Sequence, residues 1–284
     1  MELTFLGTGG SQPVPLPLCN CGLCSEASEQ GAPYTRYGYS MYLPELRGMI
    51  DASEFAPFNL NRWGVTELDR LFLTHWHPDH TAGLRLLTMR PGDPREGETH
   101  LDMKRRTAPT VVTTREVYER TCNQVRSLRY FVEELGLADV HFLDERPFRA
   151  DGFRVEAVPY PLSAGGPEEA TGFVFHRGEE SLAVVADDAR YFDWERLPAH
   201  LDAAVFECGH FTHGPDGDRI RAEGEDADDL SHDEVRRLVR RVDPDRAFLS
   251  HISHHYRHSY DDLREREREY DRTQFAHDGL SVTV

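Results

Sequence analysis

The sequence has almost no lysine and no long apolar segment. Lys104 is the only lysine among the 32 basic residues, which face 50 acidic residues and leave a formal net charge of −18. A surface of this charge repels the phosphates of nucleic acids and anionic lipids. The chain has no run of eighteen apolar residues, and its first residues, MELTFLG, lack the charged and apolar regions of a secretory signal. We therefore expect a soluble, cytoplasmic protein that binds no membrane and for which nucleic acid is a disfavoured partner.

The acidic, lysine-poor composition also favours salt adaptation, a halophilic property in which surface charge serves solvation. Under this hypothesis the free energy of unfolding rises from low to multimolar salt, because salt screens the repulsion among acidic side chains. Chemical denaturation at several salt concentrations measures this dependence. A free energy of unfolding that stays constant or falls with added salt would contradict the hypothesis.

The chain has an odd number of cysteines, and they are unevenly distributed along it, which disfavours a disulfide framework. Three of the five cysteines, Cys19, Cys21 and Cys24, lie within six residues. Thiolates at such short spacing are typical zinc ligands, so this segment predicts a metal site. Three free, buried thiols are the less favoured interpretation.

Short apolar segments of strand length recur along the chain. They are LTFLG, SMYLPE, MIDAS, LFLTH, TVVTT, FRVEAVPY, TGFVF, LAVVADD, AAVFEC, AFLSHI and LSVTV. Many strands mixed with few helices predict a layered α/β sandwich. No repeat, linker or change of composition divides the sequence, so we expect a single domain over residues 1–284.

Three segments have helical patterns. The clearest runs over residues 115–135, where apolar side chains recur on one face and Gly136 follows as a stop. A second covers residues 82–89, and a third begins at the capping residue Ser231. The acidic stretch 214–229 is either a plain surface loop or a lid over a site.

The segment LFLTHWHPDHTAGL, residues 71–84, carries three histidines and an aspartate after an apolar strand. Alternate residues of an extended segment share a side, so we expect His75 and His77 to face one ion and Asp79 and His80 another. Imidazoles and carboxylates suit zinc and similar divalent ions, and an open coordination position lets a bound water ionise and act as the nucleophile. A mononuclear structural site is the alternative, because two-metal catalysis needs further ligands from elsewhere in the chain.

The His-x-His-x-Asp-His motif resembles the signature of the metallo-β-lactamase superfamily, and the resemblance extends over nearly the whole chain. It implies the α/β fold called the metallo-β-lactamase αββα sandwich, and a metal-dependent hydrolase. By resemblance, Asp51 matches the family's early aspartate, Asp187 its bridging aspartate and His251 its late histidine. The implied ligands of one or two catalytic Zn²⁺ or Mn²⁺ ions are His75, His77, Asp79, His80, Asp187 and His251.

The segments LGTGG, CNCGLC and LSHISH resemble the PhnP-type cyclic phosphodiesterases within that superfamily. This implies a structural Zn²⁺ held by four side chains, Cys19, Cys21, Cys24 and His254, with His255 as the alternative if the register slips by one. It also implies a small phosphodiester substrate, a cyclic nucleotide or cyclic ribose phosphate, and Asp79 and His210 as catalytic residues. His213 could serve in place of His210. The sequence leaves open whether the chain forms a homodimer.

The sequence departs from the family at one metal ligand. The family's histidine after a strand like FRVEAVPY corresponds to Leu162, and no histidine lies between His141 and His176. The first ion would then keep only His75, His77 and Asp187. Water or a distant residue completes that site, one metal suffices, or the chain is a non-catalytic carrier similar to PqqB. A tRNase Z-like nuclease is a further alternative, which the acidic surface disfavours.

Overall fold

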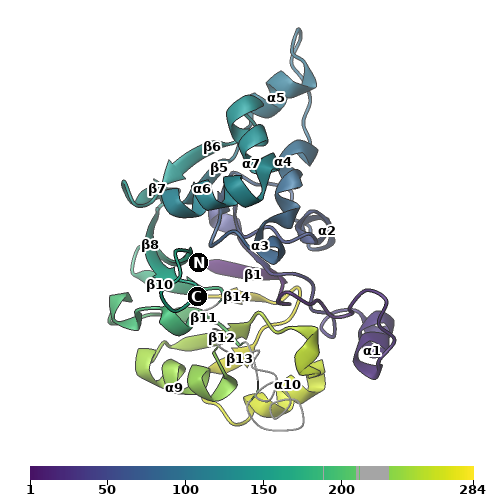
Figure 1. Ribbon diagram of the computed structural model, residues 1–284, viewed down its shortest axis with the longest axis vertical. Helices are drawn as coiled ribbons and strands as arrows, with labels where there is room; N and C mark the ends of the chain where they lie inside the picture. Colours follow the sequence, from purple (N-terminus) through teal and green to yellow (C-terminus); the bar gives the residue numbers. More distant parts are fainter. Residues whose placement is uncertain (188, 209–210, 212–229) are drawn as a thin grey trace.

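The structure is a computed structural model that describes residues 1–284 except 188, 209–210 and 212–229. In this described part, two seven-stranded sheets pack face to face, with helices on their outer sides (Figure 1). The expected αββα sandwich is therefore confirmed. None of the helices in the described residues has the length and apolar character needed to span a bilayer.

The strands follow a simple order in both sheets. The first sheet has the order β14-β1-β2-β3-β4-β5-β6, with β1 (Glu2–Gly7), β2 (Ser40–Leu43), β3 (Gly48–Ile50), β4 (Arg70–Phe72), β5 (Thr110–Thr113), β6 (Asp139–Phe142) and β14 (Ser281–Thr283). The second has the order β13-β12-β11-β10-β9-β8-β7, with β7 (Phe148–Ala150), β8 (Phe153–Pro161), β9 (Glu169–Arg177), β10 (Glu180–Val185), β11 (Ala203–Glu207), β12 (Arg246–Ser250) and β13 (Thr273–Phe275). Each of the eleven apolar segments contains one of these strands, while β6, β7 and β13 were not expected.

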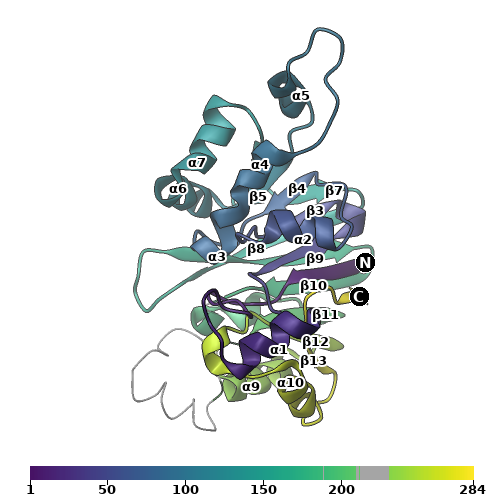
Figure 2. The ribbon, with the colours of Figure 1, turned by 90° about the vertical axis from the view of Figure 1, so that its right-hand side faces the viewer.

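Helices cover the outer face of each sheet (Figure 2). The α-helices are α1 (Gly22–Gln30), α2 (Ala56–Arg62), α3 (Pro78–Thr81), α4 (Leu86–Met89), α5 (His100–Arg106), α6 (Arg115–Gln124), α7 (Arg126–Arg129), α9 (His232–Val242) and α10 (Tyr260–Glu267). The 3₁₀ segments are η1 (Pro44–Leu46), η2 (Ala82–Arg85), η4 (Ala189–Tyr191), η5 (Trp194–Arg196) and η6 (His254–Tyr256), and η3 (Tyr130–Glu134) is a short π-helix.

The core lies in three layers. Aromatic side chains such as Phe5, Phe72, Phe173 and Phe248 fill the space between the sheets and are fully buried. One further apolar cluster lies under the helices on each outer face. Burying a phenylalanine of this kind stabilises the fold by about 1.5–3 kcal/mol, so the inter-sheet layer is a rigid base for the strand ends.

Two of the three predicted helices differ in their bounds or continuity from the helices in the structure. The helix over residues 115–135 was expected to be continuous, but it ends at Val125 and resumes as α7 and η3. The break lets α6 contact β9 while α7 contacts η2. The helix over residues 82–89 begins earlier, with α3, and continues as η2 and α4. The third expectation is confirmed, because Ser231 forms a capping box at the start of α9.

The strand directions bring distant residues to one edge. Strands β3 to β6 are parallel in the first sheet, and β10 to β13 are parallel in the second. The segments that follow β3, β4, β10 and β12 carry Asp51, the histidine motif, Asp187 and His251. Ligands of open α/β sheets bind at such carboxyl ends, so the fold by itself predicts a site there.

Candidate functional site

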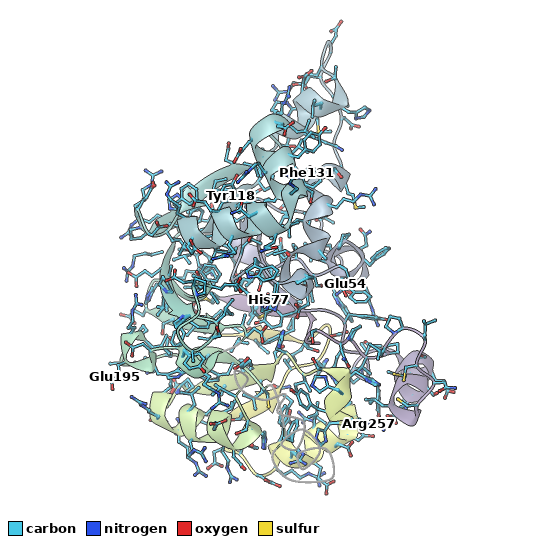
Figure 3. The ribbon with its side chains drawn as sticks, in the orientation of Figure 1. Glu54, His77, Tyr118, Phe131, Glu195 and Arg257 are labelled. Carbon is cyan, nitrogen blue, oxygen red and sulfur yellow. The ribbon has the colours of Figure 1, made fainter. Side chains whose placement is uncertain are left out.

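Two groups of side chains that could hold a metal ion lie side by side at this edge. His75, His77 and Asp187 form what we call the first cluster, and Asp79, His80, Asp187 and His251 form the second cluster. Within each cluster the potential ligand atoms all lie within 4.8 Å of one another. Asp187 belongs to both, and Figure 3 places His77 between the upper and lower halves of the molecule. The structure therefore brings together all six residues that the resemblance indicated.

The second cluster is a compact set of nitrogen and oxygen atoms. His251 Nδ1 lies 3.1 Å from Asp187 Oδ1, and His251 Nε2 lies 3.3 Å from Asp79 Oδ2. His80 Nε2 lies 3.2 Å from His251 Nε2. Burial lowers the pKa of His80, but the carboxylates of Asp79 and Asp51 outweigh it and hold that pKa well above its ordinary value. Several carboxylates gathered around buried histidine rings are typical of a site that binds a cation.

The first cluster offers an electron pair suited to a metal. His75 is fully buried, and its Nε2 has no hydrogen-bond partner among the described residues although Asp187 Oδ2 lies 3.6 Å away. Burial and the neighbouring His80 and His77 lower the pKa of His75 far below its usual value, so its imidazole is neutral. A neutral imidazole nitrogen that faces a shared carboxylate fits a divalent ion.

Asp51 belongs to neither cluster but fixes the orientation of His80. Its Oδ2 accepts a hydrogen bond from His80 Nδ1 at 2.7 Å, and Thr74 donates to both carboxylate oxygens from its amide and hydroxyl groups. Asp51 has a left-handed backbone (φ 55°), a conformation that costs energy for a residue with a Cβ. The carboxylate turns His80 Nε2 toward the second cluster, as carboxylates behind metal-binding histidines do.

Replacing Asp51 by alanine is expected to lower metal affinity at the second cluster by roughly 10–100-fold, because His80 loses the partner that holds its ring. Competition with a chelator measures this affinity. Asp69→Ala is the matched control, since Asp69 directly precedes β4 and pairs with the partly exposed Arg47. Equal affinities in the Asp51 and Asp69 variants would contradict the orienting role.

The glycine turn after β1 lies against the same site. A Cβ added at Gly10 would lie 3.1 Å from two ring atoms of His251 and 2.5 Å from Ser253 Oγ, so Ser253 and the His251 ring would have to shift to admit a side chain. The residue after His251 is also bound to this turn, because the backbone N–H of Ile252 donates to the carbonyl oxygen of Thr8 at 3.1 Å. The GTGG segment thus lies against the second cluster through Gly10.

The cysteines form a third group, apart from the two clusters. Cys19, Cys21, Cys24 and His254 place their ligand atoms within 4.8 Å of one another, and we call this group the cysteine cluster. His254 Nε2 lies 3.4 Å from Cys21 Sγ and 3.7 Å from Cys19 Sγ. The backbone N–H of Cys24 and the His254 ring lower the pKa of Cys21 to about 6. Thiolate character, three sulfurs and one imidazole fit a closed tetrahedral zinc site.

Several expectations fall elsewhere. His210, His213 and the stretch 214–229 lie outside the described residues. Leu162 is buried (4 % exposed) among apolar side chains on the outer face of the second sheet and does not belong to either cluster.

Sequence reasoning missed Glu168, whose carboxylate accepts a hydrogen bond from Trp76 inside the histidine motif. No local sequence pattern marks Glu168, because only the register of β8 with β9 sets it opposite Leu162.

The comparisons with known proteins agree with this geometry. The family model called Beta-lactamase superfamily domain matches residues 43–252, a range that includes every member of the first and second clusters. No curated protein matches the sequence.

Solved structures show the same fold. A diphosphatase of the PhnP family is 22% identical, covers 100% of this chain and 97% of its own, and has a TM-score of 0.70. Zinc-bound PqqB from Methylobacterium extorquens is 21% identical over 100% of both chains, with a TM-score of 0.71. The short form of human tRNase Z is 16% identical over 100% of this chain and 99% of its own, with a TM-score of 0.63. The chain belongs to the metallo-β-lactamase superfamily, whose fold generally supports metal-dependent hydrolysis.

Proposed function

We propose that this chain is a phosphodiesterase that holds two catalytic divalent ions, Zn²⁺ or Mn²⁺, and acts on cyclic nucleotides or cyclic ribose phosphates. One observation carries the proposal: Asp187 belongs to both clusters, so a single carboxylate can bridge two neighbouring ions. Paired ions of this kind are typical of enzymes that cleave phosphate esters. Two of the similar structures, a PhnP-family diphosphatase and a tRNase Z, support a substrate that contains phosphate by their names.

Each residue has a definite part in this proposal. Ions held by the two clusters supply Lewis acidity and make a water molecule nucleophilic near neutral pH. His75 and His77 bind one ion, and His80 and His251 bind the other. Burial raises the pKa of Asp79, but His80 and His251 overcome this and keep it below its ordinary value, so Asp79 stays ionised and can orient the attacking water. His210, outside the described residues, is proposed to assist at the leaving oxygen.

The rest of the chain completes the proposal. The cysteine cluster holds one structural Zn²⁺, residues 1–284 form one domain, and the partner is a small phosphodiester. The net charge of −18 supports a small substrate over a nucleic acid. The proposed place of action is the cytoplasm.

Hydrolysis of bis(p-nitrophenyl) phosphate, with Zn²⁺ and with Mn²⁺, tests the proposal, and a 2′,3′-cyclic nucleotide tests the substrate class. We expect turnover of both with at least one metal. No turnover of either compound with either metal, in protein that holds the ions, would overturn the proposal.

A carrier function similar to PqqB is the second candidate. It is favoured by Leu162, since the first cluster has only three ligands where the second has four. The same assay separates the two functions, because a carrier binds metal without turnover. A nuclease similar to tRNase Z would instead cleave precursor tRNA in preference to the small substrates.

A further inference from the structure

The first cluster has fewer protein ligands than the second. His75, His77 and Asp187 supply three, whereas the second cluster has four, and Asp187 is shared between them. The position where a third histidine was expected is Leu162, whose side chain is buried among apolar groups and offers no donor atom. Three protein ligands and a water molecule are the usual set at a catalytic zinc ion, so the first cluster leaves a coordination position that a side chain close to His75 and His77 could also take.

The hairpin that carries Leu162 presents a carboxylate on the same side. Strands β8 and β9 pair Pro161 with Glu169, and the Leu162 amide donates to the Glu168 carbonyl at 2.9 Å. Leu162 and Glu168 thus lie directly opposite each other. Opposite residues of a hairpin project from the same face, with Cβ atoms about 4.5–5.5 Å apart. Glu168 therefore lies one cross-strand step from the position where the histidine was expected.

The Glu168 side chain points toward the histidine motif. Its Oε2 accepts a hydrogen bond from Trp76 Nε1 at 3.2 Å, and the Trp76 ring lies 4.8 Å from the His77 ring, centroid to centroid. Arg120 of α6 lies 3.7 Å from the other carboxylate oxygen and donates to Pro167 O, which fixes this end of the hairpin. Trp76 lies two residues before α3, which begins at Pro78, directly after His77.

We propose that Glu168 is the fourth protein ligand of the ion held by His75, His77 and Asp187. This inference rests on the two-ion site of the proposed function, but it concerns metal binding and not the substrate. A carboxylate oxygen is a usual ligand of zinc and manganese, and the three rotatable bonds of a glutamate side chain let it leave Trp76 for the ion. The chain thereby replaces the imidazole of one strand with a carboxylate from the opposite strand.

Metal content and metal affinity test the inference without any substrate. Wild-type protein loaded with Co²⁺ or Zn²⁺ is expected to hold three ions per chain, one in each cluster. Glu168→Gln is expected to lose one of them, with affinity for that ion lowered by about 100-fold or more. Glutamine keeps an oxygen that can accept from Trp76, so a purely structural role of that hydrogen bond would leave the ion count unchanged.

Two further variants make the result specific. Glu169→Gln removes the same charge from the next residue, which is exposed, and is expected to keep all three ions. Glu168→Gln combined with Leu162→His is expected to regain the lost ion, because it restores a ligand on the opposite strand. Equal ion counts and affinities in wild type and Glu168→Gln would overturn the inference, as would a wild-type protein that binds no ion in the first cluster. Absence of phosphodiesterase activity with these metal results intact would overturn only the proposed function.

Discussion

Replacement of Asp187 by alanine is expected to release the ions of both clusters and to abolish hydrolysis. Asp187 is the one residue shared by the clusters, and its carboxylate lies 3.1 Å from His251 Nδ1 and 3.6 Å from His75 Nε2. Lewis-acid stabilisation by bound metal is worth several kcal/mol in the transition state, so its loss lowers the rate on the order of 10³-fold or more. Elemental analysis and the bis(p-nitrophenyl) phosphate assay measure the two effects on the same sample.

A control variant separates this effect from a general change of charge. Glu195→Gln removes one negative charge at an exposed position of η5, well away from His77 (Figure 3). It is expected to keep its metal content and its activity. The cysteine cluster should also keep its zinc in the Asp187 variant, because the clusters share no residue with it. An Asp187→Ala protein that retains two ions besides this zinc would show that the bridging role is wrong.

The strands and the candidate ligands of the histidine motif could be recognised in the sequence because their signals are local. A β-strand in a two-sheet sandwich is buried on at least one face, so apolar runs such as AAVFE and RAFLS mark strands directly. The histidine motif carries four potential ligands within six residues. The contacts of Asp187 and His251 with the motif are not local, and the resemblance to a family supplied them.

The short helices escaped prediction because they bury little. Helix α1 buries only Cys24 and Ala27, and α10 buries only Leu263, so neither shows an apolar stripe. The one sign of α10 in the sequence is its capping box between Ser259 and Asp262.

Over residues 115–135 the sequence predicted more regular structure than is present, namely one continuous helix. The apolar spacing there is continuous, but the helix breaks at Val125 because tertiary contacts on two different elements outweigh local periodicity.

The orienting role of Asp51 and the position of Glu168 could not be read from local pattern either. Asp51 alone looks like a turn residue, and its role appears only when the His80 ring is placed 2.7 Å away. Glu168 is one of many acidic residues in an acidic chain, and only the strand register gives it a place opposite Leu162. A side-chain role that depends on strand register or on contacts between distant residues can be recognised only once the fold is known.

The cysteine cluster is expected to stabilise the catalytic clusters, although it shares no ligand with them. His254 belongs to the cysteine cluster and His251 to the second cluster, three residues earlier in the chain. The segment between them is held by the N-terminal loop, because His254 N donates to Gln12 O at 2.9 Å and Arg36 Nε donates to Ile252 O at 3.2 Å. His251 itself has a left-handed backbone (φ 60°), which surrounding contacts must maintain.

Replacing Cys21 by serine is therefore expected to remove one zinc ion, to lower the melting temperature and to reduce hydrolysis together. Zinc binding contributes about 10–16 kcal/mol in zinc-finger peptides, and we expect the loss of one thiolate here to cost several kcal/mol, or roughly 10 °C in Tm. Elemental analysis, thermal unfolding and the phosphodiesterase assay give the three readouts.

The matched control for this variant is Cys122→Ala. Cys122 is a buried cysteine of α6 that belongs to no cluster, so its replacement measures the cost of removing a thiol from the core. That variant should keep its zinc and its activity. If Cys21→Ser protein kept its full zinc content, the cysteine cluster would not be a metal site. If it lost zinc while hydrolysis stayed unchanged, the segment 251–254 would hold His251 in place without the metal, and the proposed coupling between the two sites would be wrong.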